Sequence, residues 1–206
     1  MIDFIKWLGH ASILISIGGK NTYIDPWKLT KDQPKGDLVL VTHNHYDHFS
    51  PDDINRIARK DTVIIGPYDI MKLKTGEKIN ITPGKELDLG WIKIKGVPAY
   101  NIKKNFHPKI NDYLGYLIEI ENKKIYVAGD TDFIPEMKEI KADIVIVPIG
   151  GTYTMNAEEA ANAVNIMKPQ IAIPYHYGDI IGSEKDAKIF SSFVLNTKVE
   201  ILKEER

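Results

Sequence analysis

The sequence predicts an α+β fold in which two mixed β-sheets pack face to face and helices cover their outer faces. This prediction depends on the order of the elements. Several strands come first, a helix and a strand then alternate, and the same order recurs in the second half of the chain. The chain shows no repeat of fixed period and no linker, so one domain over residues 1–206 is expected.

The beginning of the chain predicts three strands, at residues 2–7, 11–17 and 22–24. Gly18 and Gly19 tolerate positive φ and therefore predict a hairpin between the second and third strands. Asp25-Pro26 ends the third strand, because proline has no N–H to donate to a β-ladder. A polar loop is expected over residues 28–36.

The next stretch, Leu38 to His48, reads LVLVTHNHYDH and combines a strand with a cluster of polar side chains. Its four apolar residues suit a strand buried on both faces. Where that strand ends, the metal-ligand types begin, as His43, His45, Asp47 and His48. Imidazole and carboxylate bind zinc or iron without a thiolate. A chance polar loop is the alternative, but half of the six histidines lie here, which favours a metal site.

The remaining segments continue the alternation of strands and helices. Ser50 as N-cap and Pro51 in the first turn predict a helix. Asn156-Ala157-Glu158-Glu159 resembles a capping box, and the helix that it opens would end before Pro169. Strands are expected at residues 62–65, 143–148, 171–174 and 199–202, a period-two segment at 78–95 and a hairpin at 113–127. Further helices are expected at residues 68–74 and 183–193.

Composition narrows the class of protein. Hydrophobic residues make up 43% and charged residues 27%, which is typical of a globular domain. The net charge of −1 creates no field that would attract nucleic acid or an anionic membrane. The chain has no cysteine, so any metal must be held by nitrogen and oxygen. No signal peptide and no run of roughly 20 apolar residues is present, so a cytoplasmic location without a membrane partner is expected.

Two further ligand-type residues follow buried strands. Asp130 comes after a strand ending at Val127, and His176 comes after a strand ending near Ile173. Strands that run in the same direction bring their ends together, so three separate strands would deliver such residues to one edge. Singly, Asp130 is as consistent with a structural turn as with a site, and a lone His176 is more often structural. With the first cluster, both become candidate metal ligands.

These motifs resemble those of a known superfamily. His43-Asn44-His45-Tyr46-Asp47-His48 resembles the H-x-H-x-D-H signature of the metallo-β-lactamase superfamily, and Gly129-Asp130 and His176 resemble its bridging aspartate and final histidine. Gly9-His10-Ala11-Ser12 and Ile24-Asp25-Pro26 resemble the branch that includes L-ascorbate-6-phosphate lactonase and uncharacterised metal-dependent hydrolases. The resemblance covers almost the whole chain. It implies a four-layer αββα sandwich with two metals at one edge of the sheets.

The resemblance also implies a ligand set for two ions bridged by one carboxylate. The first ion would be bound by His43 and His45, and the second by Asp47, His48 and His176, with Asp130 between them.

The resemblance fails at one position. A third histidine ligand of the first ion is expected from a loop in the middle of the chain, and Asn101 stands there. His107, six residues later, has three possible roles. It completes the first metal site, it contacts substrate, or it is a structural or surface histidine.

The chemistry expected of such a site is hydrolysis. Two divalent ions about 3.5–4 Å apart activate a water molecule as hydroxide, which attacks a small ester, lactone or phosphodiester. Zinc is the first choice for this ligand set, with manganese or iron as alternatives. Asp47 is expected to orient the hydroxide. His10 is expected to act catalytically, by contacting the substrate or by orienting a metal ligand, and Asp25 is expected to contact substrate or to fix the tautomer of a ligating histidine. For both residues the alternative is a buried hydrogen bond or a turn cap.

The sequence also allows other hypotheses about the substrate and the function. Lys103, Lys104 and Lys109 lie near His107 and either form a solvated surface or attract an anionic group on a small-molecule substrate. Tyr153 is a candidate wall of the cleft. A nuclease or RNA-processing enzyme is disfavoured by the near-neutral charge. A non-catalytic metal- or ligand-binding protein with a partial site is favoured only by Asn101.

Overall fold

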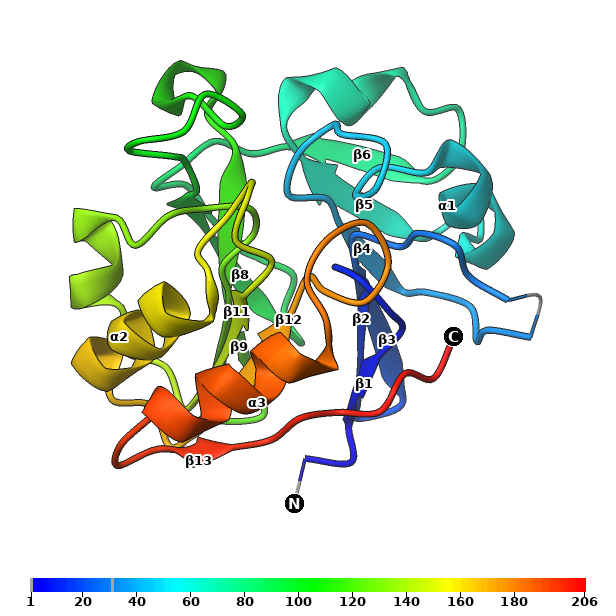
Figure 1. Ribbon diagram of the computed structural model, residues 1–206. Coiled ribbons are helices and arrows are strands. Elements are labelled where there is room, and N and C mark those ends of the chain that lie inside the picture. The colour runs from blue at the N-terminus through cyan, green and yellow to red at the C-terminus, as the bar shows by residue number, and fades with distance from the viewer. Residues whose placement is uncertain (1, 31) are drawn as a thin grey trace.

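The computed structural model describes residues 2–30 and 32–206, which form two β-sheets packed face to face (Figure 1). The first sheet has the order β1 (Ile5–Trp7), β2 (Ile13–Ile17), β3 (Lys20–Ile24), β4 (Leu38–Leu40), β5 (Val63–Gly66) and β6 (Glu77–Asn80). The second has the order β13 (Lys198–Val199), β12 (Ile171–Tyr175), β11 (Ile144–Pro148), β10 (Lys123–Val127), β9 (Leu114–Ile120), β8 (Lys93–Pro98) and β7 (Glu86–Asp88). Residues 1 and 31, which belong to the predicted domain and to the predicted loop over 28–36, lie outside the described residues.

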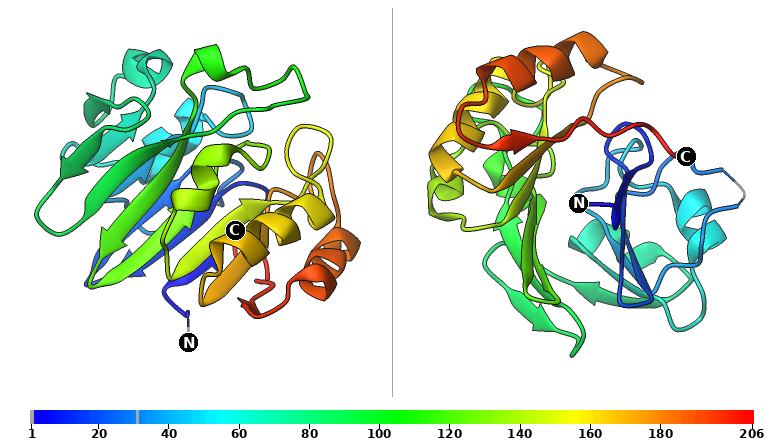
Figure 2. Two further views of the ribbon diagram at one scale, coloured as in Figure 1. Left: turned by 90° about the vertical axis from the view of Figure 1, so that its left-hand side faces the viewer. Right: turned by 90° about the horizontal axis from the view of Figure 1, so that it is seen from below.

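Helices cover the outer face of each sheet (Figures 1 and 2). Ile54 and Ile57 of α1 (Pro51–Ile57) pack with Val39 and Ile64 of the first sheet. The helices α2 (Ala157–Met167) and α3 (Glu184–Phe193) pack against β11 and β12 of the second sheet. Three short 3₁₀ helices complete the described elements: η1 (Tyr68–Lys72), η2 (Lys109–Asn111) and η3 (Pro135–Glu139). The predicted four-layer sandwich is therefore confirmed. Within the described residues, no helix is long and apolar enough to span a bilayer.

The core between the sheets explains why the apolar segments became strands. Ile15 and Leu40 of the first sheet are buried against the side of the second sheet that carries Tyr116 and Ile125. The β4 strand is buried along its whole length, as its unbroken apolar sequence predicted. The buried Tyr116 hydroxyl donates a hydrogen bond of 2.6 Å to the carbonyl of Val41, which joins the two sheets beside the end of β4.

The predicted caps are present, but several element boundaries differ from the predicted ones. Ser50 caps α1, and Asn156 and Glu159 form the reciprocal capping box of α2. The segment 78–95 is divided between the sheets, because β6 closes the first sheet and β7 opens the second. The last strand is Lys198–Val199 and not residues 199–202, since the chain then leaves the sheet and forms a bridge between Glu204 and Trp7.

The directions of the strands determine which loops lie together at one edge of the sheets. Strands β3 to β6 are mutually parallel, and so are β10 to β13. Strand β8 has the same direction as β10, because each is antiparallel to β9. The carboxyl ends of parallel strands meet at one edge of a sheet, and ligands bind preferentially at such an edge.

Candidate metal centre

The candidate residues lie in loops that follow these strands, except for one that lies between the antiparallel β1 and β2. The loops contribute His10 between β1 and β2, Asp25 after β3, residues 43–48 after β4, His107 after β8, Asp130 after β10 and His176 after β12. His10, Asp25 and His176 have φ values of 46°, 46° and 60°. A non-glycine residue in this left-handed region costs about 1–3 kcal/mol, and such strain concentrates at functional sites. The backbone N–H of His176 donates to the His10 carbonyl at 2.8 Å, which joins two of these loops.

One group of side chains contains three imidazoles. His43, His45 and His107 each offer a ring nitrogen, and these nitrogens lie within 4.8 Å of one another. The His43 Nε2 and His45 Nδ1 atoms are 3.0 Å apart. The structure therefore places His107 beside the two histidines predicted for the first ion.

Asn101 lies behind His107 and fixes the orientation of its ring. The Asn101 amide nitrogen donates to Asp132 Oδ1 at 3.2 Å and to the Tyr153 carbonyl at 2.9 Å, so its Oδ1 atom is the acceptor that faces His107. That oxygen lies 3.1 Å from His107 Nδ1. Since an amide oxygen only accepts, Nδ1 carries the proton and Nε2 presents a lone pair to the centre. Burial lowers the pKa of His107 to about 4, so the ring is neutral at pH 7.

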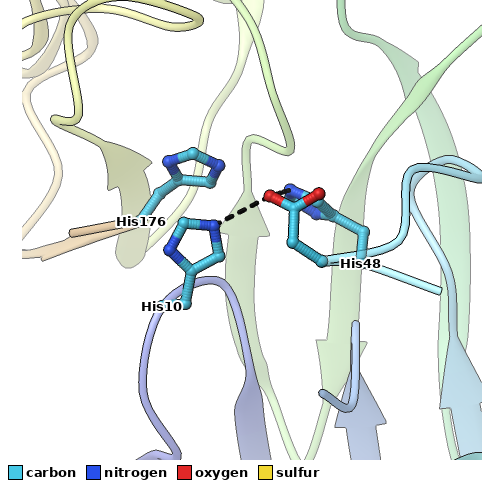
Figure 3. A group of neighbouring side chains, drawn as sticks. His10, His48 and His176 are labelled. Carbon is cyan, nitrogen blue, oxygen red and sulfur yellow. Dashed lines mark hydrogen bonds and ion pairs between the residues drawn. The ribbon is translucent and has the colours of Figure 1, made fainter. Parts of the chain in front are cut away.

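A second group contains His10, Asp47, His48 and His176, whose ligand atoms also lie within 4.8 Å of one another. Figure 3 shows the rings of His10 and His176 side by side, facing His48. His10 Nε2 is 3.0 Å from Asp47 Oδ2. The superfamily resemblance assigns Asp47, His48 and His176 to the second ion, and the contact between His10 and Asp47 is not predicted by it. The sequence singles out His10 only through the motif Gly9-His10-Ala11-Ser12.

Asp130 lies between the two groups. Its Oδ2 is 3.3 Å from His107 Nε2, and its Oδ1 is 3.1 Å from His176 Nε2 and 3.4 Å from His48 Nε2. These three ring nitrogens and Asp130 Oδ1 are buried, and none makes a hydrogen bond within the part of the chain that the structure describes. Leaving a buried polar atom unpaired costs about 1–3 kcal/mol. Several such lone pairs converging on one space fit a bound cation.

Asp25 and Thr42 orient two of the histidines from behind. Asp25 Oδ2 is 2.7 Å from His48 Nδ1 and accepts a 2.6 Å hydrogen bond from the Thr42 hydroxyl. The Thr42 oxygen in turn lies 2.9 Å from His43 Nδ1. Both rings therefore direct Nε2 towards the centre. A carboxylate that receives the outer N–H of a ligating histidine fixes the ring and raises its basicity.

The charged groups around the centre shift one another's pKa values. Burial opposes ionisation of Asp130, but the neighbouring His176 and His48 hold its pKa well below the usual range. Burial also acts against the charge on His48, yet the carboxylates of Asp130 and Asp25 raise its pKa well above that of free histidine. Burial, followed by the charge of His48, keeps the pKa of His43 well below 6.5. A neutral His43 with an ionised carboxylate nearby is the form that binds a metal ion.

A cavity of about 260 Å³ opens onto both groups. It is lined by His45, Tyr46, Asp47, Phe106, His107, Asp130, Tyr153 and Ile180. Tyr153, a candidate wall of the cleft from the sequence, therefore lines this cavity.

The fold and the site define a class of protein, and comparison with known families agrees. Residues 4–176 match the family model described as the beta-lactamase superfamily domain, and the chain belongs to that superfamily. Within it, the relatives belong to the UPF0173 family. A UPF0173 metal-dependent hydrolase of Methanopyrus kandleri is 34% identical, over 96% of this chain and 95% of its own. One from Lysinibacillus sphaericus is 32% identical, over 97% and 96% of the two chains.

Solved structures share the fold. A candidate metal-dependent hydrolase of Parabacteroides distasonis is 31% identical and superposes with a TM-score of 0.87, over 98% of this chain and 93% of its own. A metallo hydrolase of Ignicoccus hospitalis, 24% identical, has a TM-score of 0.80 over 98% and 95% of the two chains, and shows the fold alone. The predicted superfamily and sandwich are thereby confirmed.

Proposed function

We propose that the protein is a hydrolase that uses two divalent cations to cleave a small ester, lactone or phosphodiester. The observation that carries the proposal is the Asp130 carboxylate, whose two oxygens face two different groups of imidazole nitrogens. The names of the UPF0173 relatives as metal-dependent hydrolases support it.

The ligand atoms divide into two sites. The first ion would be held by His43, His45 and His107, the second by Asp47, His48 and His176, and Asp130 would contact both. Zinc suits a site of three imidazoles, and the carboxylates would also accept manganese or iron. When bound, two such ions lower the pKa of water to about 7 and stabilise negative charge on a substrate oxygen.

Asp47 and His10 act together in this proposal. Burial alone would raise the pKa of Asp47, but the hydrogen bond from His10 and the charge of His48 lower it to about 2. The Asp47 carboxylate is therefore ionised at neutral pH. Burial lowers the pKa of His10 to about 4, which keeps that ring neutral. A neutral His10 that donates from Nε2 holds the Asp47 carboxylate in place. Asp47 then orients the attacking water and accepts a hydrogen bond from it.

The test combines metal content with turnover. The protein is dialysed against zinc or manganese, analysed for metal, and assayed with p-nitrophenyl butyrate and bis-p-nitrophenyl phosphate. We expect about two ions per chain and metal-dependent turnover of at least one substrate. Asp130→Ala should lose both ions and turnover, whereas Asp88→Ala, on the exposed side of β7, should keep both. Two ions retained in Asp130→Ala, or turnover unaffected by chelation, would contradict the proposal.

A further inference from the structure

The walls of the cavity beside the candidate metal centre indicate a class of substrate. We infer that the substrate is a small uncharged ester or lactone, an inference that rests on the proposed hydrolase function. Its aryl or short alkyl group would pack on Tyr46, Phe106, Tyr153 and Ile180. These four residues are called the apolar wall below.

Three of the four side chains of the apolar wall are exposed although they are large, and Tyr153 is half-buried. Tyr46 is 67% exposed, Phe106 47% and Ile180 37%. Phe106 and Tyr153 pack edge to face with ring centroids 4.7 Å apart. Adjoining exposed apolar side chains beside a cavity are typical of a ligand-binding surface. An apolar group placed there would remove their surface from water.

The rest of the lining places the reaction at one end of the cavity. His45, Asp47, His107 and Asp130 line the same space. A carbonyl carbon near these residues would leave the remainder of the molecule against the apolar wall. The volume of about 260 Å³ has room for a small group of this kind.

The lysines near the cavity pair with other groups or line a different cavity. Lys104 Nζ lies 2.6 Å from Asp132 Oδ1 and 2.8 Å from the Thr154 carbonyl, and Lys109 Nζ lies 2.9 Å from Glu136 Oε1. Lys103 lines a different cavity together with Lys104 and Asp132.

A charged group away from the scissile bond would therefore lack a partner. None of the eight lining residues, all in the described part of the chain, is Lys or Arg. Burying an unpaired phosphate or carboxylate against apolar side chains is costly. The anion site was one of two alternatives for the lysine-rich loop, and these contacts do not favour it. The cavity favours an uncharged substrate.

The first experiment compares two esters with the same leaving group. The zinc-loaded protein is assayed with p-nitrophenyl butyrate and with p-nitrophenyl hemisuccinate, whose acyl chain ends in a carboxylate. We expect kcat/KM to be at least about tenfold higher for the neutral ester. Phe106→Ala and Tyr153→Ala should each lower kcat/KM for the butyrate by up to about tenfold. Ile110→Ala is the matched control, because Ile110 lies in the same segment, is 86% exposed and does not line the cavity.

The second experiment separates binding from catalysis. Binding of the amide N-phenylbutanamide, which resists hydrolysis, is followed by NMR in the wild type, in Phe106→Ala and in Ile110→Ala. If Phe106→Ala weakens binding of the amide but no ester is hydrolysed, the hydrolase function is refuted while the apolar binding site is supported. Preference for the hemisuccinate, or equal binding by Phe106→Ala and the wild type, would overturn the inference. So would a dimer in sedimentation that Phe106→Ala converts to monomer, because the wall would then be a subunit interface.

Discussion

The side-chain amide oxygen of Asn101 accepts hydrogen bonds from two nitrogens of His107. It lies 3.0 Å from the backbone nitrogen and 3.1 Å from the ring Nδ1 of His107. Asn101 stands where the superfamily resemblance implies a histidine. The chain between these two residues turns back, with the Asn101 N–H donating to the His107 carbonyl at 2.7 Å. The turn delivers an imidazole to the centre from a position six residues later.

This pairing makes Asn101 a positioning residue for the first ion. Asn101→Ala should weaken binding of that ion by about 10- to 100-fold, because His107 loses the acceptor that fixes its tautomer. Titration with zinc, followed by competition with a chelator, measures both affinities. Asn105→Ala, an exposed change in the same loop, should leave both unchanged. Unaltered affinity in Asn101→Ala would refute this positioning role.

Asp25 is expected to control the second ion through His48. Asp25→Asn keeps the size of the side chain but removes the charge and the second carboxylate oxygen that receive the bonds from Thr42 and His48. We expect zinc affinity to fall by about 10- to 100-fold and the melting temperature of the metal-free protein to fall as well. Asp61→Asn, at an exposed site, serves as the control. Unchanged affinity and melting temperature would refute this role.

His10 is expected to position Asp47 and not to bind metal. His10→Gln should retain two ions and lower kcat by about 100-fold, with a smaller effect on KM, because the Asp47 carboxylate is no longer held. Metal analysis and steady-state kinetics on one preparation distinguish the two roles. Loss of one ion in His10→Gln would instead make His10 a ligand of the second ion.

The buried histidines predict a pH dependence of stability for the metal-free protein. The pKa is lowered to about 4 in both His10 and His107, whereas histidine in an unfolded chain titrates near 6.5. Between these values the unfolded state binds more protons, so stability that is present above pH 6.5 is lost as the pH falls towards 4. Each group contributes a slope of up to about 1.4 kcal/mol per pH unit.

Thermal melting after chelation, between pH 7 and pH 4.5, measures this dependence. His107→Gln removes one of the histidines whose pKa is lowered and should give a shallower decline than the wild type. A melting temperature that stays constant over this range would contradict the lowered pKa values.

Much of the arrangement was predictable from local patterns. The apolar run before His43 predicted a fully buried strand, and Ser50-Pro51 and the Asn156 capping box predicted two helix starts. These signals are local, since a cap or a buried strand depends on a few neighbouring residues. The division of residues 78–95 between the sheets was not predictable, because period-two alternation does not say which sheet a strand joins.

The sequence by itself determined which side chains are available to hold cations: histidine and carboxylate at the ends of buried strands, and no thiolate. Only the tertiary structure decided that His107 joins His43 and His45, that His10 contacts Asp47, and that Lys104 and Lys109 pair with carboxylates. The physical reason is that these contacts join residues far apart in the chain. Their partners are set by how the loops pack at the shared edge of the two sheets, and no pattern of neighbouring residues encodes that packing.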